Sequence, residues 1–271
     1  MERIILIETS TALCSVALAE DGKVTAYKES SAPKAHASLT AVFVQEVLEE
    51  RGVKLADCDA VCVSKGPGSY TGLRVGVSTA KGLCFGSGKP LLAVGTLDTL
   101  VAQAAEIADT DVIPSSHNVI PSSHNVIPSS HNVIPSEVEG SSSYRFIIPM
   151  IDARRMEVYS AVFEAQDVIA RSEATWQSRQ ITETTPVIVD ETSFAEYLEQ
   201  GPVLFIGDGA GKCADVIKHP NAHFCQCNPK ASAMLAPAIA AYRAGQFEDV
   251  AYFEPFYLKE FVATVSKKKL F

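Results

Sequence analysis

The chain has 271 residues, 47% of them hydrophobic, and carries a formal net charge of −9. This length and apolar content suffice to bury a sizeable core, as one large domain or two of ordinary size. The acidic charge argues against capture of nucleic acid or an anionic membrane by this surface alone, because both of those ligands are negatively charged.

The first 108 residues predict a subdomain that opens with three antiparallel strands, at 3–8, 13–20 and 23–30. Asp21-Gly22 is a strong two-residue hairpin signal between the second and third strands. Beyond them the apolar pattern predicts a helix over 35–51, a strand over 59–64, a strand over 89–95 and a helix over 96–108. Three antiparallel strands followed by alternating helices and strands predict a mixed sheet with helices on its faces. This is the pattern of the ribonuclease H-like unit from which actin-like ATPases are built.

The middle of the chain contains the unit IPSSHNV three times between Ile113 and Val133. Each unit has one proline and two serines, which exclude a continuous helix. Three histidines fall here and could form a metal-binding array, but the composition favours a disordered insertion over 109–143. A polar stretch at 166–179 breaks a strand pattern, and we interpret it as a second insertion.

Residues 144–230 predict a second, smaller subdomain that repeats the arrangement of hairpin, helix and strand of the first. Its elements are a strand, turn and strand over 144–165, a helix over 191–200, a strand with a glycine-rich turn over 203–212 and a helix to Lys218. A helix over 231–244 could return to the first subdomain, and 245–271 forms a C-terminal tail. We therefore expect an α/β fold of two ribonuclease H-like (actin/Hsp70-like ATPase) subdomains with mixed sheets flanked by helices.

The stretch SKGPGSYTGLRVGVSTAKGL (64–83) raises the question of phosphate binding, because glycine-rich turns between a strand and a helix often hold phosphate. It fails the P-loop template, since no Gly-Lys-Ser/Thr follows at the required spacing. It also fails the dinucleotide template, since the third glycine is at 72 rather than 71. What remains is a tight turn at 65–69, with Ser69 or Thr71 as the N-cap of a helix.

That helix has a stripe of small residues, because Gly72, Gly76 and Ala80 are four apart and share one face. Each interior glycine costs about 1 kcal/mol relative to alanine, so a close backbone approach is the expected compensation. Two interpretations stay open: the smooth face packs on the protein's own sheet, or it meets a second protein. The candidate interface consists of Tyr70, Gly72, Leu73, Gly76, Val77 and Ala80.

Two turns correspond to those that grip nucleotide phosphates and metal in actin-like ATPases, at 8–12 and 152–156. The first has acid and hydroxyl groups but no glycine, and the second has two arginines where a phosphate loop would be bare. They form a degenerate nucleotide cleft that could bind ATP or ADP weakly, with Glu8, Thr9, Ser10, Asp152, Gly207 and Gly209 as its residues. We predict no catalytic residues and no cofactor.

Other groups of candidate catalytic or metal-binding residues match known sites less well. His36 has no histidine at i+4, and no Gly-x-Ser-x-Gly nucleophile elbow occurs. The segment HPNAHFCQC (219–227) suggests zinc, but Pro220-Asn221 precludes the helix that would align His219 with His223. Cys225 and Cys227 share one face of a strand without the usual knuckle, so we predict no metal site.

The seven cysteines are scattered without a Cys-x-x-Cys motif, which is typical of reduced thiols. The first ten residues read as a buried strand rather than a signal peptide. No apolar run is long enough to span a bilayer. These features favour a cytoplasmic location without membrane contact.

The stretch 64–83, with ILIETSTALCSVAL before it and IDARRMEVYSAVF after it, resembles the TsaB (YeaZ) family. The likeness runs over most of 1–110 and 144–165, and GDGA and the final helix agree more loosely. The two insertions have no counterpart in the family pattern. Glu8 stands where the family usually has aspartate, which weakens any metal–nucleotide turn.

The resemblance implies a non-catalytic subunit with an actin/Hsp70-like fold. It would dimerise with TsaD, the subunit that transfers a threonylcarbamoyl group to the adenosine beside the anticodon of ANN-decoding tRNAs. It also implies a homodimer when the chain is alone, a TsaE-like ATPase as a further partner, and tRNA contact only through the complex. The helix after the Gly-Pro-Gly turn would form both dimer contacts, so Gly76→Arg should abolish them and leave the fold intact.

Two alternatives stay open. One is an actin-like ATPase or sugar-kinase relative with its own nucleotide chemistry. The other, less favoured, is a glycoprotease-type metallopeptidase, which would need a bound metal.

Overall fold

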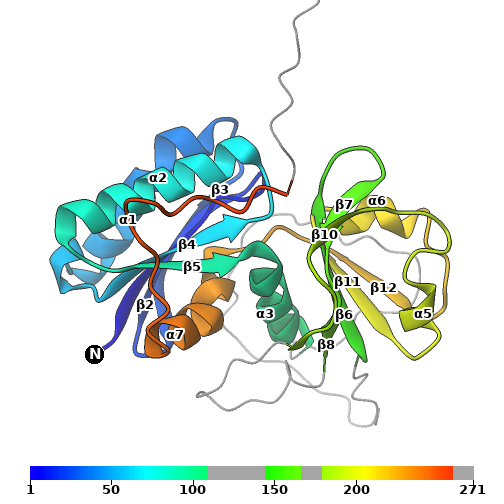
Figure 1. Ribbon diagram of the computed structural model, residues 1–271. Coiled ribbons are helices and arrows are strands. Elements are labelled where there is room, and N and C mark those ends of the chain that lie inside the picture. Colours follow the sequence, from blue (N-terminus) through cyan, green and yellow to red (C-terminus); the bar gives the residue numbers. More distant parts are fainter. Residues whose placement is uncertain (109–143, 166–178, 259–271) are drawn as a thin grey trace, which may run out of the picture.

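A computed structural model describes residues 1–108, 144–165 and 179–258, which form two lobes with a helix between them (Figure 1). The predicted insertion at 109–143, all but the last residue of the one at 166–179, and the end of the tail lie outside the described residues.

The first lobe is built on a five-stranded sheet in the order β3-β2-β1-β4-β5. The strands are β1 (Arg3–Glu8), β2 (Cys14–Glu20), β3 (Lys23–Ser30), β4 (Ala60–Gly66) and β5 (Leu91–Gly95). The first three strands are antiparallel, whereas β4 and β5 run parallel to β1. The predicted hairpin turn is present, and Asp21 and Gly22 both have positive φ, as a type I′ turn requires.

The second lobe repeats this order in the sheet path β10-β7-β6-β11-β12. Here β7 and β10 continue antiparallel from β6, and β11 and β12 are parallel to it. The bounds are β6 (Phe146–Asp152), β7 (Glu157–Ser160), β10 (Thr185–Ile188), β11 (Val203–Gly207) and β12 (Ala222–Gln226). The short strand β8 (Phe163–Glu164) also pairs with β6, and β9 (Arg179–Gln180) pairs with β8. Two copies of one mixed-sheet topology confirm the predicted fold class.

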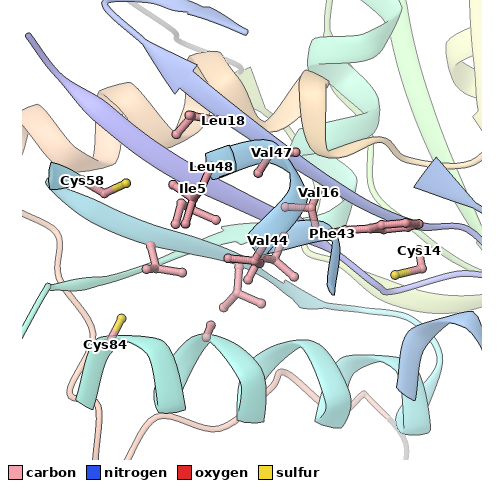
Figure 2. Close-up of a cluster of buried hydrophobic side chains, with 14 of the residues drawn as sticks. Ile5, Cys14, Val16, Leu18, Phe43, Val44, Val47, Leu48, Cys58 and Cys84 are labelled. Carbon is pink, nitrogen blue, oxygen red and sulfur yellow. The ribbon is translucent and has the colours of Figure 1, made fainter. Parts of the chain in front are cut away.

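Helices cover both faces of the first sheet. The helices α1 (Ala35–Arg51) and α2 (Tyr70–Ser87) pack on one face, where Val44, Val47 and Ala80 meet the inward side chains of β1 and β2 (Figure 2). On the other face lie the 3-10 turn η2 (Ala231–Met234) and α7 (Leu235–Arg243), whose small residues pack on β1, β4 and β5. The chain thus returns from the second lobe to complete the first.

The helix α3 (Thr96–Ala108) lies between the lobes (Figure 1). Its apolar side chains Leu97, Leu100 and Val101 belong to the core on one face of the second sheet. The opposite face is covered by α5 (Ala195–Leu198) and α6 (Ala210–Ala214). The helix α5 is shorter than the predicted 191–200, because turns occupy the rest of that range. The helix α6 lies earlier than predicted, since it begins at Ala210, within the predicted glycine-rich turn, and ends before Lys218.

After α7 the chain runs back along the first lobe as an irregular strap over residues 245–258 (Figure 1). Lys81 of α2 donates from Nζ to the carbonyl oxygens of Ala251 and Phe253, both at 3.0 Å. At the end of the strap the Tyr257 ring packs at a tilt of 40° against Tyr70, with centroids 4.9 Å apart. None of the helices in the described ranges combines the length and apolar character that a bilayer crossing needs.

A buried carboxylate joins three elements of the first lobe. Glu20, at the end of β2, accepts hydrogen bonds from Arg3 Nε at 2.8 Å, Arg51 Nε at 2.9 Å and Thr25 Oγ1 at 2.8 Å. These donors lower the pKa of Glu20 to about 2, and the hydrogen bond from Arg3 has the largest effect. The pKa of Glu20 is lower in the folded state than in the unfolded chain. Its ionised carboxylate therefore contributes fully to the free energy of unfolding above about pH 4.5, and this contribution is lost as pH falls toward 2.

Glu20→Gln is therefore expected to lower the free energy of unfolding at pH 7 by about 2 kcal/mol, since hydrogen bonds to charged groups are lost. Urea titrations at pH 7 measure this. Glu50→Gln is the matched control, because Glu50 and its partner Lys28 are far more exposed than Glu20, and ion pairs at the surface contribute at most about 1 kcal/mol. Equal effects of the two changes would contradict the role given to Glu20.

Candidate functional site

The turn after β1, where an actin-like ATPase would hold phosphate, is buried inside the first lobe. Glu8, Thr9 and Ser10 are each at most 1% exposed. The backbone N–H of Ser10 donates to Glu8 Oε1 at 2.7 Å. Burial outweighs the hydrogen bonds to the carboxylate and raises the pKa of Glu8 to about 7. These groups are therefore not open to a ligand from solution.

What closes this turn is the N-terminal part of α2 and the loop before it. A Cβ atom on Gly72 would overlap the carbonyl oxygen of Thr9, and one on Gly76 would overlap the Thr9 hydroxyl. A Cβ on Gly68 would likewise overlap the carbonyl oxygen of Ser10, which accepts a hydrogen bond from the Ser69 N–H at 2.6 Å. The glycines thus allow the protein's own turn to pack against the helix. Ser69 is the N-cap, as predicted, with its Oγ accepting from the Gly72 N–H at 3.3 Å.

This packing corrects the predicted interface. Of its six residues, five are buried within the first lobe and cannot reach another protein: Gly72, Leu73, Gly76, Val77 and Ala80. Only Tyr70 is partly exposed, and its ring contacts Tyr257 of the strap and the Arg74 guanidinium. Of the two interpretations of the smooth stripe, packing on the protein's own chain is the correct one.

The second turn, after β6, is occupied by its own side chains as well. Asp152 forms an ion pair with Lys212, which also donates from Nζ to the carbonyl oxygen of Glu157 at 2.7 Å. Arg154 and Arg155 both have positive φ and are exposed. The Asp208 carboxylate accepts from the Asp152 N–H at 2.8 Å. Burial raises the pKa of Asp208 to about 6.

Gly207 and Gly209, the remaining members of the predicted nucleotide cleft, also serve close packing. A Cβ on Gly207 would overlap the carbonyl oxygen of Met150, and one on Gly209 would lie 2.9 Å from Val158 Cγ1. Both glycines thus let the turn after β11 approach β6 and β7. Five of the six cleft residues are thus buried in their own lobes, and the sixth, Asp152, is exposed and paired with Lys212.

The outward face of α2 is the surface that the sequence reasoning missed. It consists of Thr71, Arg74, Ser78, Gly82, Phe85 and Gly86. The Phe85 side chain is 87% exposed, and a Cβ on Gly82 or Gly86 would meet nothing within 4 Å. Val42 of the neighbouring helix α1 is 43% exposed. The signal was present in the sequence, because Gly82, Phe85 and Gly86 lie at helical spacing opposite the buried stripe.

The histidines and cysteines of the described residues do not gather into a metal site. His36 contacts the carbonyl oxygen of Thr11 at 2.8 Å, and His219 Nδ1 accepts from the Asn221 N–H at 3.1 Å. His223 packs edge-on against Tyr144. Across 1–108, 144–165 and 179–258, no group of three or more histidine, cysteine or acidic residues could hold an ion.

Comparison with known proteins finds similarity to proteins of tRNA modification. The tRNA threonylcarbamoyladenosine biosynthesis protein TsaB of Escherichia coli (strain K12) is 43% identical over 103 residues, which are 38% of this chain and 44% of that protein. TsaB of Bacillus subtilis (strain 168) is 35% identical over 99 residues, 36% of this chain and 43% of that protein. A structure described as YeaZ from Pseudomonas aeruginosa superposes with a TM-score of 0.72 at 23% identity, covering 95% of this chain and 100% of that one.

This chain is similar to the TsaB (YeaZ) proteins. The sequence match spans less than half the length of the curated TsaB relatives, whereas the similarity in fold covers almost all of the chain. Residues 29–119 also match the family model TsaD, tRNA N6-adenosine threonylcarbamoyltransferase. The transferase of Agrobacterium fabrum (strain C58 / ATCC 33970) is 43% identical over 67 residues, 25% of this chain and 18% of that protein. The segment that holds α1 and α2 is therefore similar to part of the transferase as well.

Proposed function

We propose that this TsaB-like chain is a non-catalytic activating subunit of a complex that modifies tRNA. The complex would transfer a threonylcarbamoyl group to the adenosine beside the anticodon of ANN-decoding tRNAs, and this chain would act by dimerising with a TsaD-like catalytic subunit. The observation that carries the proposal is the outward face of α2, where an exposed phenylalanine stands between two open glycines.

The proposed contact follows from the shared segment. Because residues 29–119 match the TsaD model, a TsaD-like subunit would present the same pair of helices as α1 and α2. Two similar helix pairs can pack face to face about an approximate twofold axis, as in an isologous dimer. The same surface on a second copy of this chain would give the homodimer, so the two assemblies would compete.

The composition of the α2 face suits this role. Exposed phenylalanine is a typical anchor of protein interfaces, and its burial contributes about 1.5–3 kcal/mol. Gly82 and Gly86 on either side leave the helix surface flat, so that a partner helix can approach closely. Arg74 and Ser78 supply a polar rim toward the start of the helix.

The rest of the reaction is assigned to partners. The chain's own side chains and backbone fill the turns that would hold a nucleotide. This packing argues against ATPase or kinase activity of the chain itself. With a net charge of −9, the chain would reach tRNA only as part of the complex. A TsaE-like ATPase would supply ATP hydrolysis, and this subunit would need no cofactor of its own.

Phe85→Asp is expected to weaken the complex with the TsaD-like subunit by about 30-fold or more, because truncating an interface anchor costs at least about 2 kcal/mol. The change replaces an exposed side chain, so the free energy of unfolding should stay within about 0.5 kcal/mol of the original. Co-purification and calorimetric titration of the two subunits measure the affinity, and sedimentation measures the homodimer.

Ile188→Asp is the matched control, since Ile188 is 75% exposed but lies on β10 of the second lobe. It should bind the TsaD-like subunit as tightly as the original chain does. Unchanged binding by Phe85→Asp would exclude the α2 face as the contact. If the original chain does not bind the TsaD-like subunit at all, the activating role itself is wrong.

A further inference from the structure

Two of the seven cysteines differ from the others in their surroundings. Cys14, Cys58, Cys62, Cys84 and Cys213 are buried in the cores of the two lobes, whereas Cys225 and Cys227 are partly exposed, and all seven are free thiols. The exposed pair lies on the edge strand β12 and directly after it. These two are the only cysteines of the chain with appreciable exposure to solvent.

The backbone holds the two cysteines in an extended conformation. Cys225 pairs with Ile206 in the parallel ladder of β11 and β12, and the Cys227 N–H continues the ladder by donating to the carbonyl oxygen of Gly207 at 3.3 Å. Alternate residues of a strand point to the same side, so both thiols lie on one face of the sheet. On that face both pack at the margin of the core that α3 shares with the second sheet.

A disulfide requires the chain to bend after Cys225. Two residues of an extended strand span about 6.6 Å, at the upper limit of the roughly 4.4–6.8 Å between the Cα atoms of bonded cysteines. Because both side chains point the same way, their Cβ atoms are about as far apart, beyond the roughly 3.5–4.5 Å of a bonded pair. Cys227 lies just after the last residue of β12, so this bend falls at the end of the strand. A third ligand is out of reach, because four residues place His223 about 13 Å along the strand from Cys227. The geometry therefore favours thiol–disulfide chemistry over metal binding.

We propose that Cys225 and Cys227 form a reversible dithiol–disulfide site that is oxidised by a low-molecular-weight disulfide such as oxidised glutathione. The thiolate of one cysteine attacks a sulfur of the glutathione disulfide, forms a mixed disulfide and releases one glutathione thiolate. The second cysteine then attacks the protein sulfur and expels the other. Two electrons pass from the protein thiols to glutathione, and both protein protons are lost to form two glutathione thiols.

The order of attack follows from the contact between the two thiols. A hydrogen bond from Cys227 lowers the pKa of Cys225, and the same contact together with burial raises the pKa of Cys227. Cys225 therefore becomes the attacking thiolate and Cys227 the resolving thiol. Because an i, i+2 bridge is stretched in a strand, it should be reduced easily, as labile disulfides are.

The site lies where the chain passes from the second lobe to the first. Asn228 directly follows Cys227, and its carbonyl oxygen accepts from Gln103 Nε2 of α3 at 3.1 Å. The Lys230 N–H donates to Gln103 Oε1 at 3.1 Å, just before η2 packs on the first sheet. Closing the bridge would draw the end of β12 away from extended geometry at this crossing.

The test is to equilibrate the full chain with reduced and oxidised glutathione at graded ratios, followed by acid quench and mass spectrometry. We expect the native protein to lose two accessible thiols and the mass of two hydrogen atoms, with the bridge mapped to Cys225 and Cys227. Excess reduced glutathione should restore both thiols. Native protein that keeps both thiols at the most oxidising ratio would overturn the proposal.

Single variants test the assigned roles. Cys227→Ser should accumulate a stable mixed disulfide at Cys225, because no resolving thiol remains. Cys225→Ser should react with oxidised glutathione at least tenfold more slowly. Cys213→Ser is the control, since Cys213 is buried, and it should form the bridge as the native chain does. Equal rates for the two strand variants would overturn the assignment of Cys225 as the attacking thiol.

Discussion

Replacing Gly76 by arginine is expected to unfold the first lobe rather than to detach a partner. Any side chain here must displace Thr9, because even a Cβ atom would overlap the Thr9 hydroxyl. The helix cannot simply move outward, since Leu73, Val77 and Ala80 on the same face are buried in the core. Overpacking costs about 1–3 kcal/mol, and an unpaired buried charge adds several more. We expect a loss of more than about 4 kcal/mol, measured by urea unfolding or as a loss of soluble protein.

Gly82→Arg is the matched control on the same helix. Gly82 is exposed, and a Cβ there meets nothing within 4 Å. Replacing a glycine in an exposed helix interior should instead stabilise the helix by up to about 1 kcal/mol. The same change would disturb the proposed docking face, so Gly82→Arg, and not Gly76→Arg, separates binding from folding. Folding of Gly76→Arg with native stability would contradict the packing of α2 on the turn after β1.

The stability of the protein is expected to fall between about pH 4.5 and pH 7 because of Glu8. Burial raises the folded-state pKa of this carboxyl to about 7, well above that of an unfolded glutamate. In this interval the folded state binds a proton that the unfolded state has released, so the free energy of unfolding decreases as pH rises. The loss is complete above about pH 7 and amounts to about 3 kcal/mol at 1.36 kcal/mol per pH unit.

Glu8→Gln should remove most of this dependence. The amide cannot ionise, and its Oε1 can still accept the hydrogen bond from the Ser10 N–H. We expect the free energy of unfolding of the variant to exceed that of the original protein increasingly between pH 5 and pH 8, by up to about 3 kcal/mol. Urea titrations of both proteins at several pH values measure the difference.

Taking the difference between the two proteins isolates Glu8 from other groups. Asp208, whose pKa burial raises to about 6, titrates in the same interval but is common to both proteins. Parallel pH profiles for the two proteins would show that Glu8 ionises normally and that the turn after β1 is open to water.

Much of the fold could be predicted from the sequence. The hairpin at Asp21-Gly22, the helix over 35–51 and the Ser69 cap depend on neighbouring residues, because turn chemistry, apolar period and capping are local. The family resemblance also came from local motifs, and the comparisons confirm it. Local pattern was less reliable in the second lobe, where α5 is shorter than predicted and α6 begins within the predicted glycine-rich turn.

The candidate site depended on information that the sequence lacks. Both faces of α2 carry small residues at helical spacing, Gly72 and Gly76 on one and Gly82 and Gly86 on the other. Periodicity separates these two faces but does not say which one meets the sheet. The choice was decided by Thr9, which lies more than sixty residues earlier in the chain and fills the space above Gly72 and Gly76.

The sequence by itself determined the class of fold, the positions of most strands and helices, and the resemblance to the TsaB (YeaZ) family. Only the tertiary structure decided that the residues around Glu8 are closed to ligands, that Phe85 faces outward, and that Cys225 and Cys227 are the accessible thiols. The physical reason is that secondary structure follows from interactions between near neighbours. Burial, by contrast, is set by segments distant in sequence, and burial determines which groups can bind, titrate or react.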